Sequence, residues 1–152
     1  MLSVIDVIKS LTILMQENFP NYLVNDRDLE EGFERPSFFI DIAEVRGSTK
    51  TARYVTEYAE LELFMFEKNI YQGFLNLLDA KNKILVLLQQ PLKLTDGNNK
   101  TVAHIVFNDI NVTIDKADKA LSCTMNYELV QEVEVPEPEY IIEHVEIDVD
   151  IN

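Results

Sequence analysis

Apolar residues recur at helical spacing in two stretches of the chain, which predicts a helix over residues 3–18 and another over residues 70–89. Ser3 is the expected N-cap of the first helix, and Pro20 is expected to stop it. Asn69 is the expected cap of the second, and Pro91 ends it. The predicted apolar stripes are Val4, Ile5, Ile8, Leu11, Thr12 and Met15 in the first helix, and Ile70, Phe74, Leu77, Leu78, Leu85 and Leu88 in the second.

Strands are predicted over residues 22–24, 37–45, 54–66, 92–95, 102–115 and 120–130. In the third of these, Val55, Ala59, Leu61, Leu63 and Met65 share one face. In the last, Leu121, Cys123, Met125, Tyr127 and Leu129 alternate with polar residues in the same way. Asn108-Asp109 is expected to form a bulge, residues 115–119 a hairpin turn, and Asp96-Gly97-Asn98 another turn. The pattern predicts a small α+β domain.

The segment between the second and third predicted strands, residues 46–53, is too long and too polar for a tight turn. We therefore expect a projecting β-hairpin arm that carries Arg46, Lys50 and Arg53. These bases are either a solvated hairpin tip or a complement to an acidic surface on a neighbouring copy or a stacked ring. Three bases are too few to argue for binding to a nucleic-acid backbone.

Charge changes this picture at the C-terminus. The formal net charge is −14, and residues 131–152 hold eight of the 27 acids and no base, which leaves nineteen acids and thirteen bases in residues 1–130. A chain without a basic footprint is not expected to bind nucleic acid nonspecifically. The sequence also lacks a signal-peptide pattern and an apolar run long enough to span a bilayer, so we expect a soluble protein made in the cytoplasm.

The acidic segment is best interpreted as an extension of a domain over residues 1–130. Pro136 and Pro138 form a predicted hinge. After it, Val145, Ile147 and Val149 alternate with acidic residues, which is typical of a strand with one apolar face. Such a strand either pairs with its own sheet or adds to the open edge of another chain.

Candidate groups for catalysis are few. Cys123 lies on the apolar face of a predicted strand, where a buried thiol is expected rather than a thiolate. His104 lies on a strand and His144 in the acidic extension, neither in a catalytic motif. The acids near the C-terminus lack the glycine-containing loop of a calcium site, so a solvated edge is the better interpretation; these potential ligands are Glu143, His144, Glu146, Asp148 and Asp150. We expect no catalytic residue, cofactor or metal site.

One segment carries a family resemblance. Gly32-Phe33 is followed by Pro36 and then by the strand Phe38-Phe39-Ile40. Gly32 permits a sharp loop, and Pro36 fixes its own φ and favours extended geometry at Arg35, so a loop entering a core strand is one interpretation. The segment also resembles the "GF..P.FFI" signature of the tail terminator (tail completion) proteins of Gram-positive phages and phage-tail-like particles. Arg53-Tyr54 and the strand that follows resemble a second part of that pattern.

The resemblance covers residues 1–130 and implies an α+β fold with helices packed on a mixed, mostly antiparallel sheet. It implies six copies in a ring that caps the tail tube, stops its growth and meets the neck or head, with no enzymatic activity. The implied partners are further copies of the chain, the tail tube protein, and the sheath and neck or head-completion proteins, but neither a membrane nor a specific nucleic acid. The residues we expect at subunit or tube contacts are Gly32, Phe33, Arg35, Pro36, Arg46, Lys50, Arg53, Val145, Ile147 and Val149.

Two other interpretations stay open from the sequence. The −14 charge also fits an acidic interaction protein, such as a DNA mimic that occupies a nucleic-acid-binding surface. A small hydrolase would require His104 close to Cys123 or to a carboxylate in a cleft.

Overall fold

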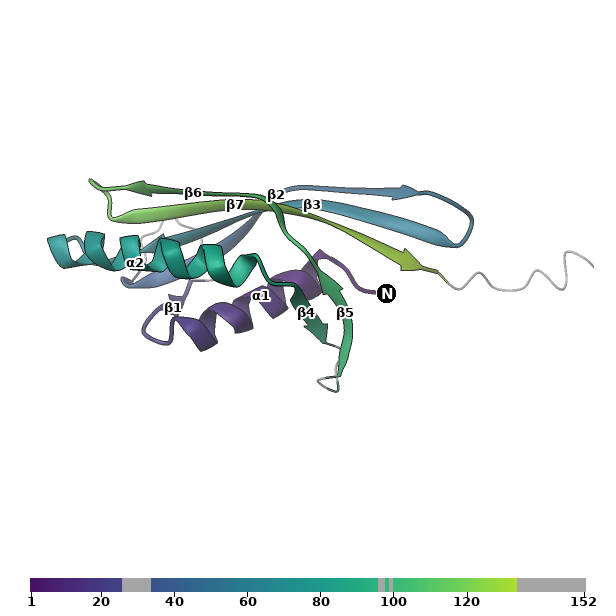
Figure 1. The fold of residues 1–152 in the computed structure, drawn as a ribbon, viewed down its shortest axis with the longest axis horizontal. Coiled ribbons are helices and arrows are strands. Elements are labelled where there is room, and N and C mark those ends of the chain that lie inside the picture. Colours follow the sequence, from purple (N-terminus) through teal and green to yellow (C-terminus); the bar gives the residue numbers. More distant parts are fainter. Residues whose placement is uncertain (26–33, 96–97, 99, 134–152) are drawn as a thin grey trace, which may run out of the picture.

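The computed structural model describes residues 1–25, 34–95, 98 and 100–133, and this part of the chain forms two helices and seven strands (Figure 1). The predicted turn at Asp96-Gly97-Asn98 lies largely outside the described residues. His144 and the acidic residues around it lie entirely outside the described residues.

The first helix, α1, spans Val4–Asn18 and begins at a capping box. Ser3 Oγ accepts a hydrogen bond from the Ile5 amide at 3.3 Å, and Asp6 Oδ2 accepts one from the Ser3 amide at 2.9 Å. These bonds satisfy amides that no preceding helical turn can reach. The predicted helix and its cap are confirmed, but the buried stripe is rotated, since Ile5 is exposed. The buried residues are Val7, Leu11 and Met15.

The strands form a large and a small sheet. In the large sheet the order is β1-β2-β3-β7-β6, with β1 parallel to β2 and every other neighbouring pair antiparallel. The bounds are Leu23–Val24 for β1, Ser37–Thr49 for β2, Tyr54–Phe66 for β3, Asn108–Asp115 for β6 and Ala120–Glu132 for β7. In the small sheet β4 (Leu92–Thr95) pairs with β5 (Thr101–Ile105). The predicted α+β fold with a mixed, mostly antiparallel sheet is confirmed.

Both helices lie on the same side of the large sheet in Figure 1. The strand face toward them is apolar and closed to solvent, as the alternation predicted. Its members include Ala59, Leu61, Leu63 and Met65 of β3, and Leu121, Cys123, Met125 and Tyr127 of β7, none more than 1% exposed. The core therefore follows directly from the period-two pattern of β3 and β7.

The second helix, α2, spans Tyr71–Leu88 and differs from the prediction at its start. Its N-cap is Ile70, which makes no side-chain capping bond, so the predicted cap at Asn69 is wrong. Ile70 is exposed, so the predicted stripe is also rotated. The buried face consists of Gly73, Leu77, Ala80, Ile84 and Leu88. A Cβ at Gly73 would lie only 2.1 Å from the carbonyl oxygen of Lys68, so close backbone approach requires glycine there.

The single strand predicted over residues 102–115 is wrong, because the structure divides it between the two sheets as β5 and β6. Between them Phe107 is buried and packs edge-on against Tyr127, with ring centroids 6.1 Å apart. The register of β6 against β7 shifts between Asn108 and Asn111, and Asp109 has a φ of 52°. The irregularity expected at Asn108-Asp109 is therefore present, and aspartate is among the residues that tolerate this backbone region.

Candidate interaction surfaces

The far end of the large sheet projects beyond the helices as an arm. We define the arm as residues 41–49 of β2, the turn at residues 50–53, residues 54–59 of β3 and residues 127–132 of β7. Figure 1 shows the β2–β3 hairpin reaching past the start of α1, with β7 beside it. The β2–β3 ladder continues to the pair Thr49–Val55, so the first half of the segment predicted as a loop is strand and residues 50–53 alone connect the two strands. A hairpin arm is confirmed, and it is built of paired strands.

The structure brings the three predicted bases to this arm. The Nε atom of Arg46 lies 3.1 Å from Glu44 Oε1, and its guanidinium lies 4.4 Å from the ring centroid of Tyr58. Lys50 and Arg53 belong to the turn, where the Lys50 amide donates to the carbonyl of Tyr54 at 3.1 Å. The Arg46 and Glu44 side chains are 64% and 47% exposed, so their ion pair contributes at most about 1 kcal/mol to stability. The bases are therefore available to a partner.

Arg35 and Pro36 occupy a different place from the arm. Arg35 Nη1 donates to the carbonyl of Glu67 at 2.9 Å and to that of Asp118 at 2.7 Å, and its guanidinium lies 5.7 Å from the centroid of Phe66. The bond between Arg35 and Pro36 is cis. Arg35 thus ties the start of β2 to the end of β3 and to the β6–β7 turn. Of the other predicted contact residues, Gly32, Phe33, Val145, Ile147 and Val149 lie outside the described residues.

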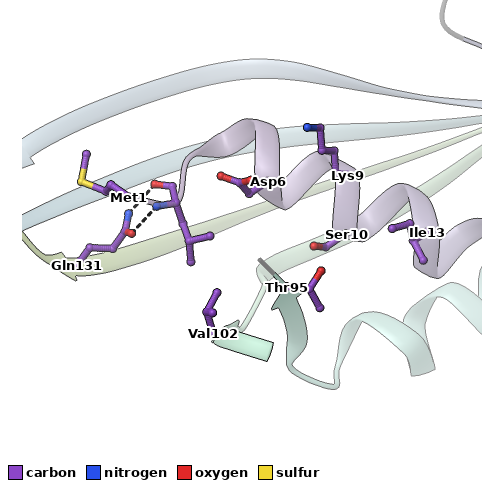
Figure 2. Close-up of a pocket in the computed structure, with 9 residues that line it drawn as sticks. Met1, Asp6, Lys9, Ser10, Ile13, Thr95, Val102 and Gln131 are labelled. Atoms are coloured by element: carbon purple, nitrogen blue, oxygen red, sulfur yellow. Dashed lines mark hydrogen bonds between the residues drawn. The ribbon is translucent and has the colours of Figure 1, made fainter. Parts of the chain in front are cut away.

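A groove of about 620 Å³ lies between the start of α1, the small sheet and the end of β7. Gln131 makes two hydrogen bonds to the backbone of Leu2 at the start of the chain, a pair that we call the clasp (Figure 2). The Leu2 amide donates to Gln131 Oε1 at 2.8 Å, and Gln131 Nε2 donates to the Leu2 carbonyl at 2.7 Å. Among the described residues that line the groove there is neither histidine nor cysteine. The lining residues are Met1, Leu2, Asp6, Lys9, Ser10, Ile13, Thr95, Val102 and Gln131.

The candidate catalytic groups are separated by the fold. Cys123 is 0% exposed inside the large sheet, and this burial raises the pKa of its thiol to about 12. A neutral thiol is a poor nucleophile, so the expectation of a buried apolar cysteine is confirmed. His104 is exposed on β5 of the small sheet. Within the described ranges, no three His, Cys, Asp or Glu side chains are grouped so that they could hold a metal ion.

A sequence-family model described as phage tail terminator protein matches residues 5–139. The chain belongs to the phage tail terminator family. No curated protein matches it. The resemblance carried by Gly32-Phe33, Pro36 and Phe38-Phe39-Ile40 is therefore confirmed. The family is structural, which gives this tail terminator a role as a component of the phage tail that contacts other tail proteins. Neither described helix of the terminator has the length and apolar content to cross a membrane.

The sequence did not reveal the role of Glu67, a buried polar residue of this tail terminator with partners on several elements. Its side chain is 5% exposed, and it accepts hydrogen bonds from Asn76 Nδ2 at 3.0 Å and from the Lys68 amide at 3.1 Å. The pKa of Tyr22 is raised by burial, by the negative charge of Glu67 and by a hydrogen bond to it. Glu67 thus joins the α1–β1 connection to α2. Its position directly after the alternating strand that ends at Phe66 was the only available signal.

Proposed function

We propose that this tail terminator forms a ring of six copies that caps the tail tube, ends its growth and joins it to the neck or head. The observation that carries the proposal is the arm, a three-stranded element that projects beyond the helices and presents bases and exposed apolar side chains. A ring needs lateral surfaces that fit copies of the same chain, and heterologous contacts of this kind close when the rotation permits. In this proposal the protein caps the tube and joins it to the neck or head through its shape and its charge.

The proposed partners are further copies of the chain, the tail tube protein, and the sheath and neck or head-completion proteins. We propose that Arg46, Lys50 and Arg53 lie at a subunit or tube contact, because these three basic residues are grouped at one exposed end of an acidic protein. Charge matching of this kind sets register and partner choice. Assembly takes place in the cytoplasm of the host bacterium, and the product is a part of the virion tail or of a phage-tail-like particle.

The acidic extension has a separate proposed role. In the ring, Val145, Ile147 and Val149 add as a strand to an open sheet edge of the neighbouring subunit and lock adjacent copies together. Deletion should begin after Val133, since β7 continues to Glu132 and Gln131 holds the chain start. Hexamers that keep their stability without residues 134–152 would remove this part of the proposal.

The test is the mass of the protein in solution, measured by size exclusion with light scattering, alone and with purified tube protein. The proposal expects hexamers, or capped tubes of arrested length when tube protein is present. Electron microscopy of the mixture gives the position of the terminator at the tube end. A protein that stays monomeric or dimeric and leaves tube growth unchanged would overturn the proposal.

A second candidate, a DNA mimic, is favoured by the outer face of the large sheet, which points away from the helices. On this face Asp41 lies directly opposite Glu62, and Glu44 directly opposite Glu60. Like charges directly opposite one another on a sheet are destabilising, so an acidic surface of this kind suits a cationic partner. Capture of a DNA-binding enzyme by monomers or dimers, in competition with duplex DNA, would support the mimic over the ring.

A further inference from the structure

The arm has two open strand edges, one on each side. β1 pairs only with Ser37 and Phe38, so residues 41–49 of β2 have no strand on their outer side in the part of the chain that the structure describes. On the opposite side, the β6–β7 ladder ends at the pair Asn108–Asn126. Among the described residues, the outer side of residues 127–132 of β7 is therefore open as well. Unpaired strand edges are templates for pairing with another chain.

The two edges run in the same direction. β2 and β7 are each antiparallel to β3, so they are parallel to one another. Copies related by the rotation axis of a ring can therefore place β2 of one copy beside β7 of the next, with the two strands running in the same direction. Each copy would use β2 on one side and β7 on the other, which is the head-to-tail contact that closes rings.

The charges on the two edges match in position. Arg46 pairs with Tyr58, and Tyr58 pairs with Glu128, so Arg46 and Glu128 lie at one level of the arm and on one face. The Lys50 amide bonds Tyr54, whose partner in β7 is Glu132. The two bases on the β2 edge are therefore four residues apart, and the two acids on the β7 edge of the same copy are also four residues apart, at the same two levels of the arm. A neighbour placed level with the first copy would align both pairs.

We propose that residues 45–50, at the end of β2 in one copy, pair in parallel with residues 127–132 of β7 in the next, so that one sheet runs through the ring. This inference rests on the proposed ring and names its lateral contact. Arg46 meets Glu128 of the next copy, and Lys50 meets Glu132, which fixes the register. The exposed side chain of Val45, which is level with Tyr127, is covered at the same contact.

Cross-linking tests the register directly. Ser48 and Val130 both pair with Thr56, so they lie at one level on opposite edges of the arm. In the double variant Ser48→Cys with Val130→Cys, mild oxidation of the assembled protein should give a ladder of covalent oligomers on a non-reducing gel. The matched control, Ser48→Cys with Thr113→Cys, puts the second thiol on the exposed edge strand β6 and should give no ladder. Native Cys123 is buried and common to both variants.

Charge reversal gives an independent readout. Arg46→Glu should lower the fraction of assembled protein at least tenfold, and Glu128→Arg should do the same. The double variant should recover most of the loss, because the pair is restored with opposite sign. A role of Arg46 that lies only within its own chain predicts no rescue, since its partners there are Glu44 and Tyr58. Absence of rescue would overturn the proposed pairing.

The outcomes separate this inference from the ring itself. If the wild-type chain does not assemble, alone or with tube protein, the ring fails and the edge pairing fails with it. If it assembles but Ser48→Cys with Val130→Cys gives no ladder, the ring stands and the edge pairing is overturned.

If the open edge that the acidic extension joins in the neighbouring subunit is that of β2, the extension competes with β7 for it. The double variant Ser48→Cys with Ile147→Cys tests this alternative under the same oxidation. A ladder from that variant, in place of the ladder from Ser48→Cys with Val130→Cys, also overturns the pairing of β2 with β7.

Discussion

The phenolic hydroxyl of Tyr127 donates a hydrogen bond of 2.8 Å to Glu57 Oε1, while its ring is fully buried. Burial, this hydrogen bond and the negative charge of Glu57 raise the pKa of Tyr127 far above its ordinary value. The pKa of Tyr22 is raised in the same direction, and that of Cys123 is raised by burial to about 12. All three groups are therefore held neutral in the folded protein.

The first prediction is a loss of stability in alkali. A raised pKa means that the folded state keeps a proton that the unfolded state releases, so stability is intact below the ordinary pKa and falls above it. The free energy of unfolding should be level from pH 7 to about 8, and then fall by about 1.4 kcal/mol per pH unit for each group whose unfolded pKa has been passed. Urea titrations at a series of pH values measure the slope.

Tyr127→Phe should make that slope smaller by the contribution of one proton above pH about 10, the ordinary pKa of tyrosine. Tyr71→Phe, at a residue that is 66% exposed, is the matched control for the loss of a tyrosine hydroxyl. Equal slopes for Tyr127→Phe and the wild type would contradict the assignment.

The second prediction concerns Glu67. Glu67→Ala leaves the Asn76 amide and the Lys68 backbone N–H without their acceptor at a part-buried site. An unsatisfied buried donor costs about 1–3 kcal/mol, so we expect the two part-buried donors together to lower the free energy of unfolding by about 1–3 kcal/mol. Chemical denaturation measures the change. Asp79→Ala, at an exposed carboxylate of α2, should stay within about 0.5 kcal/mol of the wild type.

The third prediction reverses the usual effect of alanine in a helix. Gly→Ala normally stabilises a helix interior by about 1 kcal/mol. At Gly73 the new Cβ would meet the Lys68 carbonyl oxygen at 2.1 Å, and that atom is backbone, so α2 must shift. We expect Gly73→Ala to destabilise the protein by about 1–3 kcal/mol. Thermal unfolding compares it with Asn82→Ala, an exposed site on the same helix that should be neutral or slightly stabilising.

The fourth prediction separates assembly from folding at the arm. Replacing Arg46, Lys50 and Arg53 together with alanine should change the free energy of unfolding of the isolated chain by about 1 kcal/mol or less, because exposed ion pairs contribute little. The same variant should assemble poorly, and its remaining assembly should lose its dependence on salt between about 0.05 and 0.5 M. Light scattering across a salt series makes the measurement.

The control for the arm replaces Lys68, Lys81 and Lys93 with alanine, which removes the same charge from other parts of the surface. If the control and the arm variant assemble equally well, the arm bases have no special role. If the arm variant unfolds at a much lower denaturant concentration, the bases are structural.

The sequence predicted the elements whose burial is set locally. The alternation through Leu61 and Leu63 in β3, and through Leu121 and Cys123 in β7, identified the core face correctly. Ser3 and Asp6 marked the start of α1 because a capping box is a contact between near neighbours. Such patterns depend on few residues and on no distant partner.

The errors arose where distant contacts decide the structure. Residues 102–115 read as one strand because their apolar run continues through Val106 and Phe107, but the chain divides between two sheets at Phe107, which packs on the distant Tyr127. The burial of Glu67 depends on Asn76 and Tyr22, which no local pattern connects to it. The open edges of the arm follow from the strand order, which the alternation of a single strand does not contain.

The clasp between Leu2 and Gln131 has a mechanical consequence. It fastens the first residues of the chain to β7, the last strand that the structure describes, 129 positions away. Any tension applied to the chain beyond Glu132 is therefore shared between β7 and the beginning of α1. A pull from that end therefore reaches the start of the helix through these two hydrogen bonds.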